Sequence, residues 1–476
     1  MNINEFLAQK KLKLYEASVN MIDGHTICMV SDDNNDYLLD NGIEKFSGEK
    51  CGEFTLSPLT HENAVILREL FDFTCPKPVL RENCSFGVGD RLGLATDGHI
   101  SVFENYNAYP VLVQQSIREL NLTGRTYENV LDCASFSVFK NGFKKPFGAD
   151  GDHLKTPEDI EYALGLGFTM ITLDCSEHIS NSAAKLSKDE LDKTEIPAEI
   201  AQLYLEKNFD VGEGLVLTFD KTTLAQTYLI YHKAIDFACD MFNKYITDKV
   251  DFEVSIDETE TPTTPLQHFY AANELIRRGV KVTTVAPRFC GEFQKGIDYI
   301  GNIGQFEEEM KLHCTIARHF GYKISVHSGS DKFSVFPIIG KYTNGNFHVK
   351  TAGTNWLEAM KVIAQTEPAL YREIHAFALA NFSEATKYYH VTTDINKIPA
   401  LDTLTDAELP SLFTMNDARQ LIHITYGLIL SEKNSDGSFK FRDLLYKAWR
   451  VHAAEYKEAL YNHISRHLDL LGTAKA

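Results

Sequence analysis

Short β-rich runs alternate with longer amphipathic stretches through the middle of this 476-residue chain. Six such runs follow one another from about residue 79 onward: PVLVQQ, FTMITLD, FEVSID, KVTTVAPR, KISVHSG and FHVKTAG. Strand–helix alternation of this kind predicts parallel βαβ units, and six runs over roughly 280 residues favour a closed (β/α)8 TIM-type barrel over an open sheet. No GxGxxG opens a helix after a strand, which weakens the dinucleotide-binding alternative.

The two ends of the chain have other patterns. Residues 1–78 mix short apolar runs with polar turns and predict a small α/β N-terminal cap. Residues 79–370 carry the alternation and predict the catalytic barrel. From residue 371 to 476 apolar residues recur at helical spacing, which predicts a C-terminal helical appendage packed on the barrel. The expected fold class is therefore α/β, with three regions.

Charge and cysteine content limit the partners and the compartment. The chain has 47 Lys and Arg against 66 Asp and Glu, a net charge of −19, which argues against nucleic acid or an anionic membrane as a partner. No window approaches the apolar length that crosses a membrane, and the N-terminus lacks an apolar signal core. Nine scattered cysteines without a CxxC pair indicate a reducing compartment. We expect a cytoplasmic protein with a small-molecule substrate, and a homo-oligomer is compatible with this composition.

The stretch DFEVSIDETETP, residues 251–262, alternates apolar and polar side chains. Its apolar residues should meet the outer helices, so Glu253 should face the barrel interior. An acid at that position is costly unless it is paired, metal-bound or at the open end of the barrel. An internal salt bridge and a catalytic role are both open for Glu253, whereas Glu258 and Glu260 are expected in a solvated loop.

KISVHSGSDKF, residues 323–333, follows the same alternation and predicts an inward-facing His327 at the end of a strand. The turn Ser328-Gly329-Ser330 comes next, and its backbone N–H groups could hold an anion with Lys332 adding charge. A strand histidine is often only a hydrogen-bonded core residue, but TIM-barrel active sites are built at the carboxyl ends of strands. Gln115, at the end of PVLVQQ, is another candidate for binding hydroxyls or a carboxylate.

GADGDHLKTPED, residues 148–159, combines acids and a histidine just before a helix start. Thr156-Pro157 has the pattern of an N-cap followed by proline in the first turn, so GADGDH is expected to be a loop on the catalytic rim. One division of labour gives the imidazole of His153 to a metal ion and leaves Asp152 as a proton carrier. The alternative is an Asx-type turn before a capped helix.

A metal ion would need donors from separated segments, and His153 and His327 are two. The loop RFCGEFQKGIDY offers Glu292 and Gln294 as oxygen donors for a third. A mixed histidine and oxygen set suits divalent Zn, Mn, Co, Ni or Fe better than Mg or Ca. His463 and His467 also have metal-binding helical spacing, but they are expected on the surface of a polar C-terminal helix. Asp174, at another strand end, could line the pocket or pack at its rim.

Eight segments, some of them discussed above, are distributed in order along the predicted barrel. They are SFGVGDRLGLAT, QQSIREL, TGRTYENVLDCA, GADGDHLKTPED, FEVSIDETETPTTPL, RFCGEFQKGIDY, KISVHSGSDKFSVFP and FHVKTAGTNWLEA. Together these segments resemble the tagaturonate epimerase family, whose members interconvert tagaturonate and fructuronate in hexuronate breakdown. The likeness continues into RQLIHITYG and the terminal helices, whereas the first eighty or so residues match poorly.

The resemblance implies a divalent metal cation and a carboxylate pair that accepts and donates a proton. By motif, the acceptor corresponds to Asp152 and the donor to Glu253, and the metal histidines correspond to His153 and His327. The family often has Glu where this chain has Gln294, so the third ligand is left between Gln294 and the nearby Glu292. The substrate carboxylate is expected on the Ser328–Ser330 turn with Lys332.

Inversion at C4 of a 2-ketose suggests how such residues would act. C4 is β to the carbonyl, so enolisation does not acidify its own hydrogen, and a retro-aldol cleavage with re-addition is the hypothesis that avoids this. Transient oxidation would need a hydride acceptor, for which the sequence shows no nucleotide site. Alternatives from other classes are a class II type aldolase, another sugar isomerase, or a non-catalytic partner subunit of an aldolase.

Overall fold

The centre of the molecule is a closed barrel of parallel strands. The computed structural model describes residues 3–257 and 259–476, and in it eight strands pair around the ring in the order β12-β13-β14-β15-β6-β7-β8-β9. The strands are β6 (Cys84–Gly87), β7 (Tyr109–Ser116), β8 (Gly148–Leu154), β9 (Met170–Asp174), β12 (Asp251–Ile256), β13 (Thr284–Pro287), β14 (Lys323–Val326) and β15 (Phe347–Lys350). The predicted (β/α)8 barrel is confirmed.

Two barrel strands lie outside the six β-rich runs, and one of them corrects a prediction. Residues 148–154, expected to form a loop, are strand β8, and every residue of that strand except His153 is buried. Gly and Asp are depleted in strands, so GADGDHL gave no strand signal. Glycine is useful here because a Cβ on Gly148 would lie 2.9 Å from Val79 Cγ2. The other strand, β6, is only four residues long.

Helices cover the outside of the barrel and connect its strands. They are α3 (Thr96–Phe103), α4 (Ile117–Thr123), α5 (Tyr127–Lys140), α6 (Pro157–Gly165), α9 (Lys221–Tyr245), α10 (Pro265–Arg277), α11 (Ile303–Phe320), α12 (Phe336–Thr343) and α13 (Thr354–Thr366). The start of α6 is as predicted, because the Thr156 side chain accepts a hydrogen bond from the N–H of Asp159. Between β9 and α9 the chain inserts α7 (Lys188–Asp192), α8 (Ala198–Tyr204) and the hairpin β10 (Asn208–Gly212)–β11 (Leu215–Thr218).

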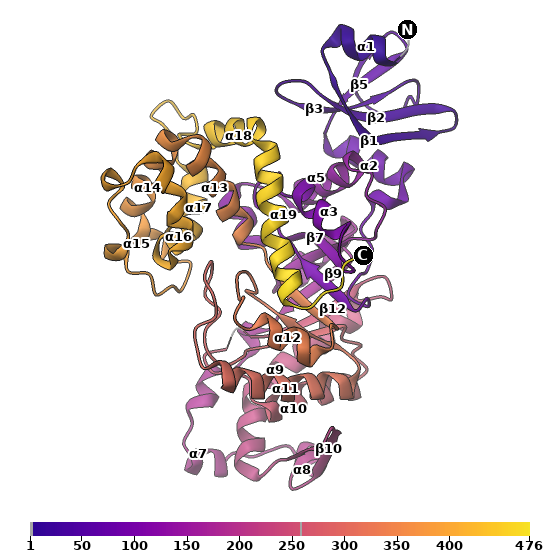
Figure 1. Cartoon of the computed structure of the whole chain (residues 1–476). Helices are drawn as coiled ribbons and strands as arrows, with labels where there is room; N and C mark the ends of the chain where they lie inside the picture. The colour runs from indigo at the N-terminus through magenta and orange to yellow at the C-terminus, as the bar shows by residue number, and fades with distance from the viewer. Residues whose placement is uncertain (1–2, 258) are drawn as a thin grey trace.

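The N-terminal region is a five-stranded antiparallel sheet with two helices. Its elements are α1 (Ile3–Lys10), β1 (Lys13–Ile22), β2 (His25–Ser31), β3 (Asp36–Asp40), β4 (Glu49–Cys51), β5 (Phe54–Pro58) and α2 (His61–Leu70). One face of the sheet packs on the barrel, because Ile27 and Met29 share a hydrophobic cluster with Phe139 of α5. Figure 1 shows this sheet at one end of the molecule, far from the helices at the bottom of the view.

The C-terminal region is helical, as predicted. Its helices are α14 (Pro368–Ala380), α15 (Phe382–Ala385), α16 (Asn416–Ile424), α17 (Tyr426–Ser431), α18 (Arg442–Val451) and α19 (Ala453–Leu470). Helix α19 joins the two parts (Figure 1): Tyr456 and Leu460 belong to the helical core, and Ile464 and Leu468 to the barrel core. Among the described residues, no helix has the length and apolar character that would cross a bilayer.

The loop after β12 was expected to be solvated. Glu260 is exposed and its carboxylate pairs with Lys185 at 2.6 Å. Glu258 lies outside the described residues.

Candidate active site at the carboxyl end of the barrel

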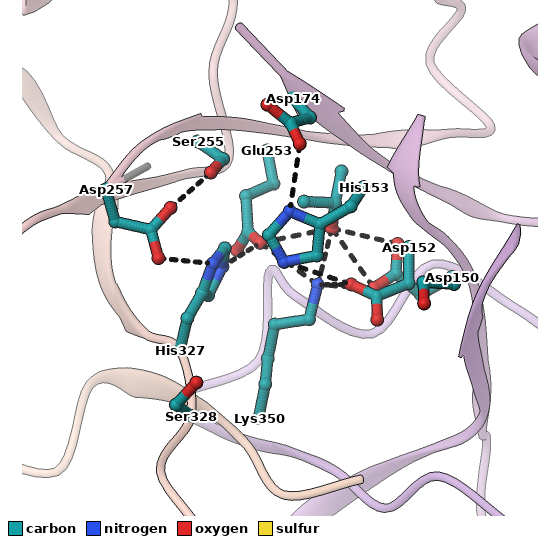
Figure 2. Close-up of polar contacts among 12 residues, drawn as sticks. Asp150, Asp152, His153, Asp174, Glu253, Ser255, Asp257, His327, Ser328 and Lys350 are labelled. Atoms are coloured by element: carbon teal, nitrogen blue, oxygen red, sulfur yellow. Dashed lines mark hydrogen bonds and ion pairs between the residues drawn. The ribbon is translucent and has the colours of Figure 1, made fainter. Parts of the chain in front are cut away.

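Lys350, the last residue of β15, is the centre of a buried ionic cluster. Its Nζ lies 2.7 Å from Asp150 Oδ2, 2.5 Å from Asp152 Oδ1 and 3.4 Å from Glu253 Oε1. It also donates to the Thr172 hydroxyl at 2.7 Å, which itself lies within 3.1 Å of Glu253 Oε1. One cation therefore holds three carboxylates together, and Figure 2 shows this arrangement around the lysine.

The carboxylates of this cluster do not share the same protonation behaviour. Burial raises the pKa of Asp150 to about 6, although Lys350 opposes this rise. Burial would also raise the pKa of Asp152 and of Glu253, but the charge of Lys350 outweighs it and lowers both below their usual range. Asp152 and Glu253 are thus ionised at neutral pH, whereas Asp150 titrates closest to neutrality.

Two histidines lie against these carboxylates. The rings of His153 and His327 have centroids 5.0 Å apart and meet edge to face. His327 Nε2 is 2.7 Å from Glu253 Oε1, and His153 Nε2 is 3.7 Å from Asp152 Oδ1. Each histidine therefore lies within ion-pair distance of one of the two carboxylates that were predicted from the sequence.

A second acid flanks each histidine on its other nitrogen. Nδ1 of His153 is 3.7 Å from Asp174 Oδ2, and Nδ1 of His327 is 3.2 Å from Asp257 Oδ2. Both Nδ1 atoms are buried and make no hydrogen bond within the described part of the chain. Burial opposes protonation of His327, but Asp257 and Glu253 outweigh it and raise its pKa to about 10. These acids attract positive charge strongly, as a cation site requires.

His153 owes its place to an unusual backbone conformation. Its φ is +57°, in the left-handed region, and the pairing of β8 with β9 shifts register between Gly151 and Leu154. This bulge lets Asp152 and His153, neighbours in the chain, both reach the cluster (Figure 2). No pattern in the sequence predicted the bulge.

Gln294 and Glu292, the predicted oxygen ligands, make other contacts. Oε1 of Gln294 accepts hydrogen bonds from the N–H and hydroxyl of Thr392, both at 3.1 Å, and from Gln420 Nε2 at 3.0 Å. Its amide nitrogen donates to Glu292 Oε2 at 2.7 Å, and that glutamate is exposed. The amide thus ties the loop after β13 to the C-terminal helical region, and neither residue contacts His153 or His327.

Lys332, the predicted partner of a substrate carboxylate, is also engaged elsewhere. It is completely buried, and its ammonium donates to the carbonyl oxygens of Gln294, Ile297 and Ser330 at 2.9, 2.6 and 2.8 Å. An ammonium has only three protons, so none is left for a ligand. Ser330 is buried in the same turn. Lys332 therefore joins the turn after β14 to the loop after β13 and is not available to bind a substrate carboxylate.

Ser328 remains beside the site, whereas the side chain of Gln115 is directed toward helix α4. Ser328 follows His327 with φ +49°, and its hydroxyl accepts a hydrogen bond from Lys295 Nζ at 3.1 Å. Gln115 is buried at the end of β7, its Nε2 contacts the Thr123 hydroxyl at 3.5 Å, and its Oε1 makes no hydrogen bond to a described residue. Lys295 itself was missed by sequence reasoning, because its loop was considered only for oxygen ligands.

His463 and His467 correct a second prediction, since they are not on the surface. Their side chains are 8% and 0% exposed, and with Asp331 they form a group whose ligand atoms lie within 4.8 Å of one another and could hold a metal ion. As the group stands, His467 Nε2 accepts from the N–H of Asp331 at 3.0 Å, and Arg419 pairs with the Asp331 carboxylate at 2.5 Å. Within the described residues His153 and His327 form no equally tight group.

Comparison with known proteins identifies the family. The family model for tagaturonate epimerase matches residues 14–471. The tagaturonate/fructuronate epimerase of Thermotoga maritima is 46% identical over 419 residues, which cover 86% of this chain and 85% of that protein. The chain belongs to the tagaturonate epimerase family.

Solved structures of this epimerase family have the same fold. The native and a glycerol-complexed crystal structure of the fructuronate-tagaturonate epimerase from Cohnella laeviribosi each superpose with a TM-score of 0.96. They are 48% identical in sequence to this chain, and the match covers 99% of both chains. The protein is accordingly an enzyme of the isomerase class, a carbohydrate epimerase, and the resemblance found in its sequence is confirmed.

Proposed function

We propose that this epimerase interconverts D-tagaturonate and D-fructuronate by inverting C4, and that the Lys350 cluster is its active site. One observation carries the proposal: at the carboxyl end of the barrel, Asp152 lies against His153 and Glu253 lies against His327. The centroids of the two histidine rings are 5.0 Å apart, so both pairs belong to one site. The names of the relatives from Thermotoga and Cohnella support this choice of substrate. Two carboxylates from different strands can address opposite faces of one carbon.

The residues support a retro-aldol route. Asp152, ionised because of Lys350, takes the proton of the C4 hydroxyl. The C3–C4 bond then breaks, its electron pair stays on the three-carbon fragment as an enediolate, and C4 becomes an aldehyde. After the aldehyde turns over, C3 attacks its other face, and the new C4 alkoxide takes up the proton that Asp152 removed, passed on through Lys350 and Glu253. Lys350 contacts both carboxylates and is placed to return the proton from Asp152.

The donor set at the cluster fits a divalent metal ion. We propose that His153 and His327 hold it through their Nδ1 atoms, which make no hydrogen bond to a described residue, with the neighbouring carboxylates of Asp174 and Asp257 in place of Gln294 and Glu292. His327 directs its other nitrogen to Glu253, the arrangement that commonly orients a metal-binding histidine. A divalent cation there would supply Lewis acidity toward the oxygens of the substrate.

The test is to incubate the wild-type protein with tagaturonate and follow fructuronate by NMR, in H2O and in D2O. We expect the epimer to form with hydrogen retained at C4, because the C4–H bond is never broken. Chelation should abolish conversion, and Zn, Mn, Co, Ni or Fe should restore it. Deuterium at C4 would contradict the retro-aldol route, conversion that survives chelation would contradict the metal, and release of a three-carbon product without epimer would indicate an aldolase.

We also propose that the protein works in the cytoplasm. All nine of its cysteines are free, and six of them are buried. Unpaired cysteines are common where thiols are kept reduced. Epimerisation of a sugar acid during hexuronate catabolism would take place in the same compartment.

A further inference from the structure

Lys295 lies beside the residues that we assign to the active site. It belongs to the loop between β13 and α11, and its Nζ donates to the hydroxyl of Ser328 at 3.1 Å. Ser328 directly follows His327 and lies next to it in Figure 2. The half-buried ammonium of Lys295 is therefore one serine side chain away from the cluster that we assign to catalysis.

This lysine differs from the two other buried lysines of the site. Lys350 has three carboxylates around it, and Lys332 uses all of its protons on backbone carbonyls. Lys295, in contrast, has a single neutral acceptor, and no carboxylate of the described residues lies within 4.0 Å of it. A half-buried ammonium without an anion is unfavourable, and two of its protons have no acceptor in the described chain.

Two arginines bring further positive charge to the same part of the rim. Arg91 follows β6, is 3% exposed, and has Nε and Nη1 without hydrogen-bond partners among the described residues. Its guanidinium lies 4.1 Å from the centre of the Tyr426 ring and is paired through Nη2 with Glu119. Arg118, in α4, lies 5.0 Å from the centre of the Tyr389 ring and has no acid within 4.0 Å in the described chain.

The charges of this group do not cancel. Lys295, Arg91 and Arg118 carry three positive charges, and Glu119 supplies one negative charge against them. Glu119 and both arginines act electrostatically on Lys295, as does Asp152 from the catalytic cluster, so the group and the cluster border one another. An excess of positive charge with unsatisfied donors next to a reaction centre is suited to an anion with several acceptor oxygens.

We propose that Lys295, supported by Arg91 and Arg118, binds the carboxylate of the sugar acid. The proposal rests on the function proposed above and adds to it the groups that distinguish a uronate from a neutral ketose. In a 2-ketose acid the carboxylate is C6, two bonds from C4, so its anchor must border the catalytic acids, as Lys295 does. We call Lys295, Arg91 and Arg118 the cationic half of the barrel mouth.

The experiment compares two substrates in one variant. For Lys295→Met we expect the KM for tagaturonate to rise about 10- to 100-fold, the range for loss of a charged hydrogen bond, while the KM for the neutral ketose D-tagatose changes less than about twofold. Lys295→Arg should retain much of the affinity for the uronate. Lys77→Met is the matched control: Lys77 pairs with Asp72 at the amino end of the barrel, and its loss should affect neither KM.

Equal losses on both substrates, or an unchanged KM for the uronate, would overturn the proposal. Calorimetric binding of D-galactonate, a non-reacting sugar acid, separates this failure from failure of the proposed function. If the wild type lacks epimerase activity but binds galactonate through Lys295, the anchor is supported and the reaction is wrong. If the wild type is active and Lys295→Met binds galactonate as tightly as the wild type does, the anchor is wrong and the reaction is retained.

Discussion

The two halves of the barrel mouth carry opposite excess charge. The acidic half, formed by Asp150, Asp152, Asp174, Glu253 and Asp257 at the ends of β8, β9 and β12, has more carboxylates than any one cation can balance. The cationic half, on the loops that follow β13, β6 and β7, has donors that lack acceptors. In the ring order of the strands the acidic half is one continuous arc, whereas β14 and β15 separate the cationic loop after β13 from the cationic loops after β6 and β7.

The difference indicates what each half is for. The acidic half has internal partners: Lys350 bridges three of its carboxylates and His327 joins two. Such a network fixes protonation states, which proton transfer requires. The cationic half is only partly paired and is covered by aromatic rings, Tyr426 from α17 and Tyr389 from the segment after α15. It is suited to recognition of a charged ligand. Substitutions in each half can test whether the acidic half performs catalysis and the cationic half binds the substrate.

The largest effect is expected from the acids that we assign to proton transfer. Asp152→Asn and Glu253→Gln should each lower kcat by about 10²–10⁴-fold, because each removes a positioned proton carrier while preserving shape. The metal content, measured by atomic absorption on the purified variants, should stay the same as in the wild type. Loss of metal together with activity would show that these carboxylates are ligands instead.

Removing the cation that bridges the acids should affect stability. Lys350→Met leaves three buried carboxylates facing one another, so we expect the free energy of unfolding at pH 8 to fall by about 3–5 kcal/mol. The raised pKa of Asp150, about 6 against 3.8, means that the folded state binds more protons than the unfolded chain in this interval. The contribution of Asp150 to stability therefore rises as pH falls through about 6, and the loss in Lys350→Met should be smaller at pH 5. Urea unfolding at pH 8 and pH 5 measures both losses, with Lys77→Met as the control. Equal losses of unfolding free energy at the two pH values would contradict the prediction.

A smaller effect is expected where the loop carrying the cationic half meets the helical region. Gln294→Ala removes the acceptor for Thr392 and Gln420, so the free energy of unfolding should fall by about 1–3 kcal/mol. Its metal content should be unchanged, because Gln294 Oε1 already accepts three hydrogen bonds. A metal-deficient but normally stable variant would restore Gln294 as a ligand.

The smallest effect is expected at the exposed edge of the cationic half. Arg118→Gln removes one solvated charge, so the KM for the uronate should rise by no more than about fivefold. The effect should shrink as salt is added, because screening weakens exposed charges most. Steady-state kinetics at low and high ionic strength measure both trends, and a salt-independent effect would indicate a direct, desolvated contact instead.

Much of the architecture could be predicted from periodicity, whereas part of the site could not. The inward direction of Glu253 follows from strand alternation, and it does contact Lys350 and His327 inside the barrel. Strand β8 escaped prediction because burial between neighbours, not β propensity, holds its glycines and aspartates extended. Gln294 and Lys332 were suggested as ligands from chemistry alone, but long-range contacts with Thr392 and with backbone carbonyls occupy them. Such partners are distant in the chain and leave no local pattern.

The division between the halves is tested most directly by steady-state kinetics of two single variants on tagaturonate. We predict that Asp152→Asn lowers kcat and leaves KM nearly unchanged, whereas Lys295→Met raises KM and leaves kcat nearly unchanged. The account would be contradicted if both variants lost the same parameter to a similar degree, because the acidic and cationic halves would then act as one catalytic unit.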